Sequence, residues 1–102
     1  MNRIVIDTTD NTRTLIKLEA DSYSDEIIEP AKPRTQATLL LIEKILKKNN
    51  INKKDLDEIL VNTGPGSFTG TRVGVAIANA LGFALDVRVN GTKLKQALPK
   101  YS

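Results

Sequence analysis

The sequence predicts an α/β domain, a mixed five-stranded sheet with helices, from three observations. Short apolar runs rich in β-branched residues recur along the chain, as strands do. Two longer stretches repeat apolar residues with helical spacing. A glycine-rich segment, Gly64 to Gly74, joins a strand-like run to a helix-like run, which is typical of a strand, turn and helix in succession. The predicted order is β-β-β-α-β-α-β-α.

The first half of the chain predicts three strands. Residues 3–7 (RIVID) are short, apolar and β-branched. Residues 12–20 alternate between apolar and polar side chains, so a second strand is expected to pair back on the first as a hairpin. Residues 25–29 form a weaker third strand, after which Pro30 and Pro33 break the pattern.

A helix is predicted from residue 34 or 35 to Asn49. At about 100° per residue its apolar face collects five side chains: Leu39, Leu41, Ile42, Ile45 and Leu46. Leu40 falls instead among polar neighbours. It is either a single exposed leucine without a function or a contact to a partner.

The second half predicts two more strands and two more helices. A short turn over 53–56, capped by Asn52, comes first. It is followed by a strand over 58–62, a helix over 70–84, a strand over 86–90 and a helix over 93–98 capped by Thr92. The strand over 58–62 is expected to be central, because it is apolar and leads into the glycine segment.

Composition bounds the function. The 102 residues suit one compact domain. Without cysteine the chain can form no disulfide and no reactive thiolate. Without histidine it lacks the commonest general base and the commonest metal ligand. We find no metal-binding pattern and no set of catalytic residues. No signal peptide is visible and no apolar stretch approaches about 18 residues, so we expect a cytoplasmic protein without a membrane partner.

Basic residues gather in one segment. Residues 34–54 carry a net charge of +5, and its lysines are Lys44, Lys47, Lys48, Lys53 and Lys54. They either form a solvated helix end, where lysines oppose the negative end of the dipole, or face an acidic partner or RNA. No aromatic residues lie among them, which argues against base stacking.

The glycine segment and the end of the first strand allow two interpretations. Asp7, Thr8, Gly64, Gly66 and Ser67 could contact a phosphate, with Asp7 holding a magnesium ion. The segment lacks the lysine of a P-loop and the spacing of a dinucleotide-binding motif. The alternative is structural, with a hydroxyl capping the helix and Asp7 closing a tight turn.

Four small residues, Gly70, Gly74, Ala78 and Gly82, lie four apart along one line of the helix over 70–84. Each glycine in a helix costs about 1 kcal/mol relative to alanine, so close packing must offset it. The sequence leaves open whether that packing is internal or is made with another chain.

Together these motifs resemble the TsaB family. The resemblance rests on IVIDTT at residues 4–9, on the run from Asp55 to Gly74 that contains GPGSFTGTRVG, and on GTKL at 91–94. It implies an actin-like (ASKHA, ribonuclease H-like) lobe. It also implies a part in forming the N6-threonylcarbamoyl group on adenosine 37 of tRNA, as a non-catalytic paralogue of TsaD. In bacteria this machinery includes a further subunit, the ATPase TsaE.

The resemblance also implies a pairing face. TsaB proteins pair with TsaD, and with themselves, through helices of the N-terminal lobe. The expected contacts are therefore Leu40, Gly70, Arg72, Gly74 and Ala78. Two features depart from the family. A second lobe of similar size is expected to be absent, and Arg34-Thr35 stands where a His-Ser pair is frequent.

We therefore expect a non-enzymatic scaffold subunit that pairs with a TsaD-like catalytic subunit and, further, with a TsaE-like ATPase. Alone it is expected to form a homodimer. We expect it to reach tRNA only indirectly and to hold no cofactor, with ATP and magnesium present only in complex with partners. The alternatives are a small nucleotide-binding domain using Asp7 and the glycine segment, and a homodimeric interaction module.

Overall fold

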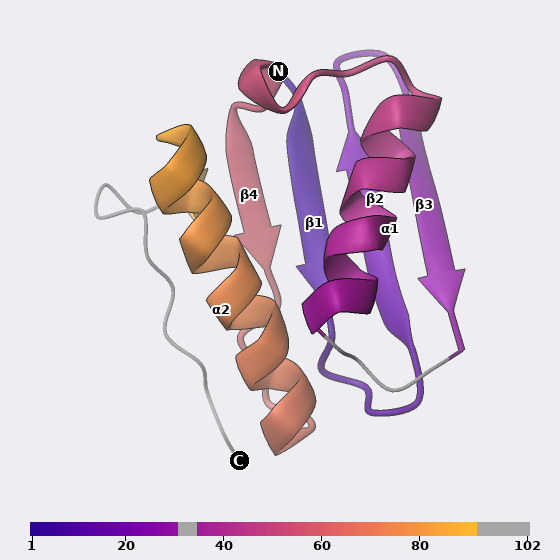
Figure 1. Cartoon of the computed structure of the whole chain (residues 1–102), viewed down its shortest axis with the longest axis vertical. Coiled ribbons are helices and arrows are strands. Elements are labelled where there is room, and N and C mark those ends of the chain that lie inside the picture. Colours follow the sequence, from indigo (N-terminus) through magenta and orange to yellow (C-terminus); the bar gives the residue numbers. More distant parts are fainter. Residues whose placement is uncertain (31–34, 92–102) are drawn as a thin grey trace.

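The computed structural model describes residues 1–30 and 35–91, which form one sheet with two long helices packed on the same face (Figure 1). The elements are β1 (Arg3–Asp7), β2 (Thr14–Glu19), β3 (Ser24–Glu29), α1 (Thr35–Lys48), the short 3-10 turn η1 (Lys53–Asp55), β4 (Glu58–Val61), α2 (Phe68–Leu85) and β5 (Arg88–Val89). This order confirms the predicted one through β5. The helix predicted over 93–98 and its Thr92 cap lie outside the described residues.

The five strands lie in the order β3-β2-β1-β4-β5, with the first two pairings antiparallel and the last two parallel. The mixed sheet predicted from the sequence is therefore confirmed. The central strand is β1, however, and β4 lies next to it. That prediction was wrong because apolar composition indicates an interior strand and does not say which interior position it takes.

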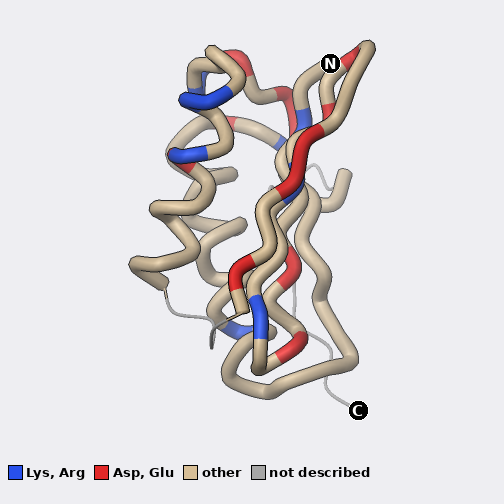
Figure 2. Tube along the Cα trace, turned by 90° about the vertical axis from the view of Figure 1, so that its right-hand side faces the viewer, with Lys and Arg blue, Asp and Glu red and all other residues tan. Residues whose placement is uncertain are grey.

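Alternating side chains place the core between the sheet and the helices. Figure 2 shows these two layers with the sheet seen from its edge. On this face lie Ile4 and Ile6 of β1 and Ile59 of β4, all fully buried. The matching pairs Ile4–Leu18 and Ile6–Ile16 continue the layer onto β2. This period-two burial is what the alternation in the sequence predicted.

Helix α1 turns a broad apolar face to the sheet, formed by Thr38, Leu41, Ile42, Ile45 and Leu46. Leu39 was expected on this face but is 38% exposed, and Thr38 takes the buried position. Two residues after α1 ends, Asn50 adopts the left-handed conformation. Asn52 then caps η1 by accepting a hydrogen bond from the Lys54 amide. The predicted Asn52 cap is confirmed.

Helix α2 begins at Phe68, two residues earlier than predicted, with Ser67 as its N-cap. Its 18 residues are long and apolar enough for a membrane span, which the sequence analysis did not expect. By length and composition alone this is weak evidence, because the core helix of a soluble protein passes the same test. In the described structure α2 packs on the sheet through seven buried residues: Gly70, Thr71, Gly74, Val75, Ile77, Ala78 and Gly82.

Strand β5 has only two residues, whereas the sequence predicted five. The reason is local. Asp86 adopts the left-handed conformation (φ 56°) and ends α2, so the strand cannot begin there. At the other end Asn90 also has a positive φ, and its side chain bonds the backbone of Val61 through both its oxygen and its nitrogen.

Candidate functional site

The glycine segment connects the end of β4 to the start of α2 and lies against the end of β1. The Asn62 amide donates to the carbonyl oxygen of Ile6 at 2.9 Å, and the Ser67 amide donates to that of Thr9 at 2.7 Å. The Ser67 hydroxyl accepts from the Gly70 amide at 3.2 Å. The predicted capping of the helix by a hydroxyl is therefore confirmed, and the capping residue is Ser67.

Asp7 is held by its neighbours. Its Oδ1 accepts hydrogen bonds from the Thr9 amide at 3.0 Å and the Thr9 hydroxyl at 2.7 Å, and its Oδ2 accepts from Asn62 Nδ2 at 3.2 Å. Partial burial raises the pKa of Asp7, but these hydrogen bonds outweigh it, so the pKa lies below its usual value. The carboxylate thus closes the turn after β1 and ties it to β4.

Two glycines sit where a side chain would collide with this turn. A Cβ on Gly66 would lie 2.6 Å from Thr9 Cβ and 2.8 Å from the Thr9 carbonyl oxygen. A Cβ on Gly74 would overlap Thr8 Oγ1, a hydroxyl that donates to the carbonyl oxygen of Gly70. Both glycines therefore allow the glycine segment and α2 to pack closely on the end of β1.

The structure brings together the five residues expected to contact a phosphate: Asp7, Thr8, Gly64, Gly66 and Ser67. The side chains of Asp7, Thr8 and Ser67 have partners within the protein, and the Gly64 amide donates to Asn62 Oδ1 at 3.0 Å. Phosphate contact stays a prediction. Among the described residues no three histidine, cysteine, aspartate or glutamate side chains form a group that could hold a metal ion.

The expected pairing contacts separate into two groups. Gly70, Gly74 and Ala78 are buried under α2 against the sheet, so the prediction that they contact a partner is wrong. The four-residue spacing correctly indicated close packing, but that packing is internal. Leu40, 59% exposed, and Arg72 lie at the surface as a partner contact requires.

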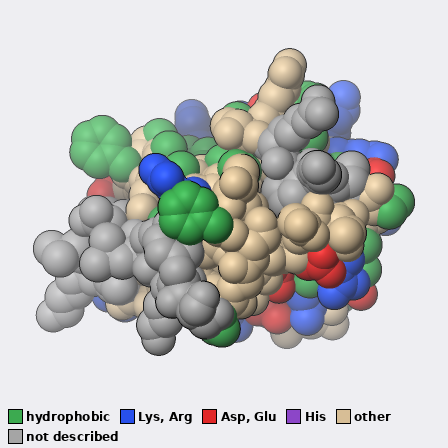
Figure 3. All heavy atoms as spheres, turned by 90° about the horizontal axis from the view of Figure 1, so that it is seen from below, with side chains coloured by type: hydrophobic (Ala, Val, Ile, Leu, Met, Phe, Trp, Pro, Cys, Tyr) green, Lys and Arg blue, Asp and Glu red, His purple; other side chains and the backbone are tan. Residues whose placement is uncertain are grey.

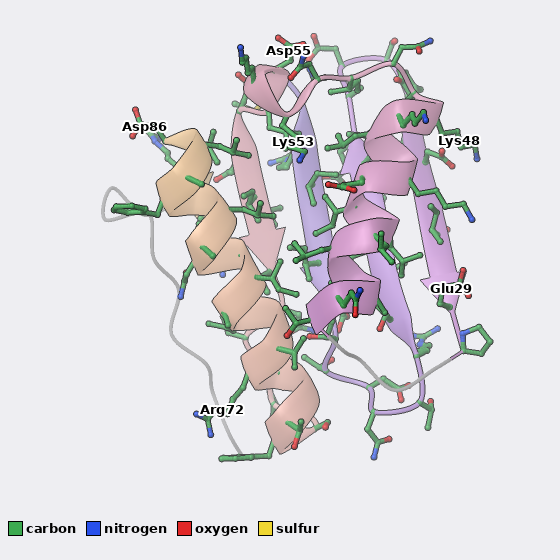
Figure 4. The ribbon with its side chains drawn as sticks, in the orientation of Figure 1. Glu29, Lys48, Lys53, Asp55, Arg72 and Asp86 are labelled. Carbon is green, nitrogen blue, oxygen red and sulfur yellow. The ribbon has the colours of Figure 1, made fainter. Side chains whose placement is uncertain are left out.

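The outer face of α2 carries the surface that the sequence analysis missed. Phe68 and Phe83 are 58% and 87% exposed, and the Arg72 guanidinium lies over the Phe68 ring, 5.3 Å from its centre. Figure 4 labels Arg72 on this side of the helix, and Figure 3 shows apolar and basic side chains together at this end of the molecule. Phenylalanine and arginine are side-chain types enriched at protein interfaces.

Between α1 and α2 runs an apolar groove of about 350 Å³, which we call the α1–α2 groove. It is lined by Thr35, Leu39, Ala76, Ile77, Ala80, Leu81 and Ala84. Its alanines recur every four residues, as the glycines do, but are shifted by two positions and so face outward. The repeat of alanines at 76, 80 and 84 was the signal in the sequence that could have revealed this line.

Comparison with known proteins decides the family. The family model described as "TsaD: tRNA N6-adenosine threonylcarbamoyltransferase" matches residues 29–96, more than half of the chain. The chain belongs to this family. Within it the chain is TsaB/YeaZ-like, as its relatives show.

Two relatives carry the TsaB name. The tRNA threonylcarbamoyladenosine biosynthesis protein TsaB of Bacillus subtilis is 29% identical over 99 residues, which are 96% of this chain and 43% of that protein. The protein of the same name from Haemophilus influenzae is 37% identical over 70 residues, covering 65% of this chain and 30% of the relative. The chain thus spans less than half the length of these relatives.

Solved structures agree on the fold. YeaZ from Pseudomonas aeruginosa superposes with a TM-score of 0.81 over 86% of this chain and 41% of the YeaZ chain, at 24% identity. A second structure with the same values is described as an uncharacterized protein with similarity to the peptidase YeaZ from Pseudomonas aeruginosa. Together with the family match, this likeness confirms the actin-like fold expected from the sequence.

Proposed function

We propose that this chain is a non-catalytic subunit in the formation of N6-threonylcarbamoyladenosine on tRNA, and that it pairs with a TsaD-like catalytic subunit through α1 and α2. The family match and the names of the TsaB relatives support the pathway. The observation that carries the pairing is the α1–α2 groove. The exposed Phe68 and Phe83 lie outside its lining, near the two ends of α2.

The chemistry of this surface suits a partner helix. Small side chains line α2 in the groove, at Ala76, Ala80 and Ala84, so another helix can approach it closely. Beside them, α1 offers exposed apolar area at Leu39 and Leu40. Phe68 and Arg72 add an aromatic residue and an arginine, two side-chain types enriched where partners bind most tightly. Burial of this surface is the driving force that we propose for pairing.

A non-catalytic role is supported by the residues at the strand ends. Asp7, the candidate magnesium ligand, already accepts three hydrogen bonds from Thr9 and Asn62. The chain has no histidine or cysteine to act as a general base or nucleophile. We therefore propose that ATP and magnesium act only in the complex with partners, a TsaE-like ATPase among them, and that the protein works in the cytoplasm.

The same surface also supports self-association. A second copy of the chain could occupy the α1–α2 groove when no TsaD is present, and the two partners would then compete. Light scattering of the isolated chain measures this directly, since a homodimer has twice the monomer mass of 11.2 kDa. A strictly monomeric chain at micromolar concentration would remove the homodimer from the proposal and leave the pairing with TsaD to be tested separately.

Co-purification with TsaD from the same organism tests the pairing. Ala80→Arg places a long charged side chain in the groove at an exposed position, so the fold tolerates it while a partner helix is excluded. Ser24→Arg is the control: Ser24 is an exposed residue of β3, and because Asp25 and Ile27 face the helices, Ser24 lies on the opposite face of the sheet. The wild type and Ser24→Arg should retain TsaD, and Ala80→Arg should lose it. Loss in neither variant, or in both alike, would overturn the proposed face.

A further inference from the structure

Five lysines lie at the end of the molecule where α1 ends and η1 follows, and basic residues gather there in Figure 2. Figure 4 labels two of them, Lys48 and Lys53, on either side of the end of α1. We call this surface the lysine corner: Lys44, Lys47, Lys48, Lys53 and Lys54, all exposed. We propose that the lysine corner binds the phosphate backbone of RNA directly. The inference rests on the proposed role in tRNA modification and deepens it, since the sequence alone led us to expect only an indirect contact with tRNA.

Two of the lysines already have counter-charges. Lys48 Nζ lies 3.2 Å from Asp25 Oδ2, and Lys53 Nζ lies 3.3 Å from Glu43 Oε1. Lys44, Lys47 and Lys54 have no acidic partner within residues 1–30 and 35–91. Compensation of the α1 dipole accounts only for lysines in its last turn, Lys47 and Lys48. Lys44 and Lys54 are thus free to meet an external anion.

The surroundings favour RNA over an acidic protein. A protein interface has an apolar centre inside a polar rim. None of the large exposed apolar side chains of the described structure falls within residues 43–58. Two of them border the lysine corner: Met1 precedes the Asn2 that donates to the Asp55 carbonyl oxygen, and Tyr23 lies two residues before the Asp25 that pairs with Lys48. Beside the lysines lies an open hollow of about 420 Å³, lined by Glu43, Leu46, Lys47, Ile51, Asn52 and Lys53.

The absence of aromatic residues defines the binding mode. Between residues 43 and 58 there is no ring on which a base could stack. Contacts would therefore go to phosphates, be indifferent to sequence, and weaken steeply with salt through counterion release. The lysine corner is also separate from the α1–α2 groove, so RNA binding and pairing can be removed independently.

The test is fluorescence anisotropy of the chain with an unmodified tRNA transcript at several salt concentrations. Lys44→Gln/Lys47→Gln/Lys54→Gln removes three charges from the corner. Arg13→Gln/Lys17→Gln/Arg88→Gln removes the same net charge outside the lysine corner, from the exposed Arg13 and Arg88 and the half-buried Lys17. Polyglutamate of matched length stands in for an acidic protein.

Three phosphate contacts predict that wild-type affinity falls roughly 40-fold between 50 and 200 mM salt. The corner variant should bind at least about tenfold more weakly at low salt and lose most of that salt dependence, while the control variant should keep both. Equal loss in the two variants, a wild type insensitive to salt, or polyglutamate binding as tightly as tRNA would each overturn the proposal. Binding of TsaD should survive in the corner variant, so failure of RNA binding leaves the pairing hypothesis intact.

Discussion

The hydroxyl of Thr8 donates a 2.5 Å hydrogen bond to the carbonyl oxygen of Gly70, joining the turn after β1 to the first turn of α2. Thr8 and Gly70 are both buried. One turn further along the helix, Gly74 lies so close to the same hydroxyl that a Cβ there would overlap it. The line of small residues in α2 therefore sets the distance between this helix and the central strand.

Gly74→Ala should destabilise the fold. Alanine favours the helix by about 1 kcal/mol, but overpacking of a tight core costs about 1–3 kcal/mol, so we expect a net loss of up to about 2 kcal/mol in the free energy of unfolding. Thr8→Ala removes the overlapping hydroxyl, so the double variant Thr8→Ala/Gly74→Ala should lose less than the sum of the single losses. Urea denaturation of all four proteins measures this coupling, and strict additivity would contradict the close contact.

Two buried threonines should respond to valine in opposite directions. Thr71 Oγ1 is buried without a hydrogen-bond partner, so Thr71→Val removes an unsatisfied group and should stabilise the fold, by up to about 1 kcal/mol. Thr8→Val deletes the bond to Gly70 and should destabilise it by about 1 kcal/mol. Thermal denaturation of both variants checks the signs. If Thr71→Val loses as much stability as Thr8→Val, the Thr71 hydroxyl makes a bond that this structure lacks.

The Asp7 carboxylate should make the stability of the domain depend on pH. Its folded pKa lies below the usual value of 3.8, so its contribution is complete above that value and is lost as the pH falls through the folded pKa. Asp7→Asn should therefore be less stable than the wild type at pH 7, and the difference should shrink below about pH 4. Urea denaturation of both proteins at pH 7 and at pH 3 measures this difference in the free energy of unfolding. A difference that stays constant with pH would show that Asp7 acts through something other than its charge.

The isolated chain should bind ATP and magnesium weakly or not at all. Asp7 is already saturated by Thr9 and Asn62, and the Ser67 amide and hydroxyl are engaged with Thr9 and Gly70. Calorimetric titration should therefore give no saturable heat at micromolar concentrations. Micromolar binding that disappears in Asp7→Asn would favour the alternative, a small nucleotide-binding domain.

Much of the fold could be predicted because local patterns and core packing agree here. The β-branched run of β1 was expected as a strand, and alternation in β2 and helical spacing in α1 each matched the face that the structure buries. The length of β5 is an exception with a local cause. Asp86 ends α2 in a left-handed conformation that its residue type permits but does not require, so β5 came out shorter than predicted.

The orientation of α2 could not be predicted, because two opposite lines of this helix both carry small side chains. The line of Gly70, Gly74 and Ala78 and the line of alanines at 76, 80 and 84 have the same spacing, and only the position of Thr8 shows which one faces the sheet. The expectation that the buried line contacts a partner was therefore wrong. Leu40 is exposed, as its place among polar neighbours predicted, and Arg72 is exposed as well. Their contact with a partner stays a prediction.

Calorimetric titration of TsaD with this chain tests the account most directly. We predict saturation at one chain per TsaD, retained in Ser24→Arg and weakened at least about tenfold in Ala80→Arg, since a charged side chain in the centre of an interface removes packing that a partner needs. Absence of saturable binding by the wild type, or equal binding by the two variants, would contradict pairing through the α1–α2 groove.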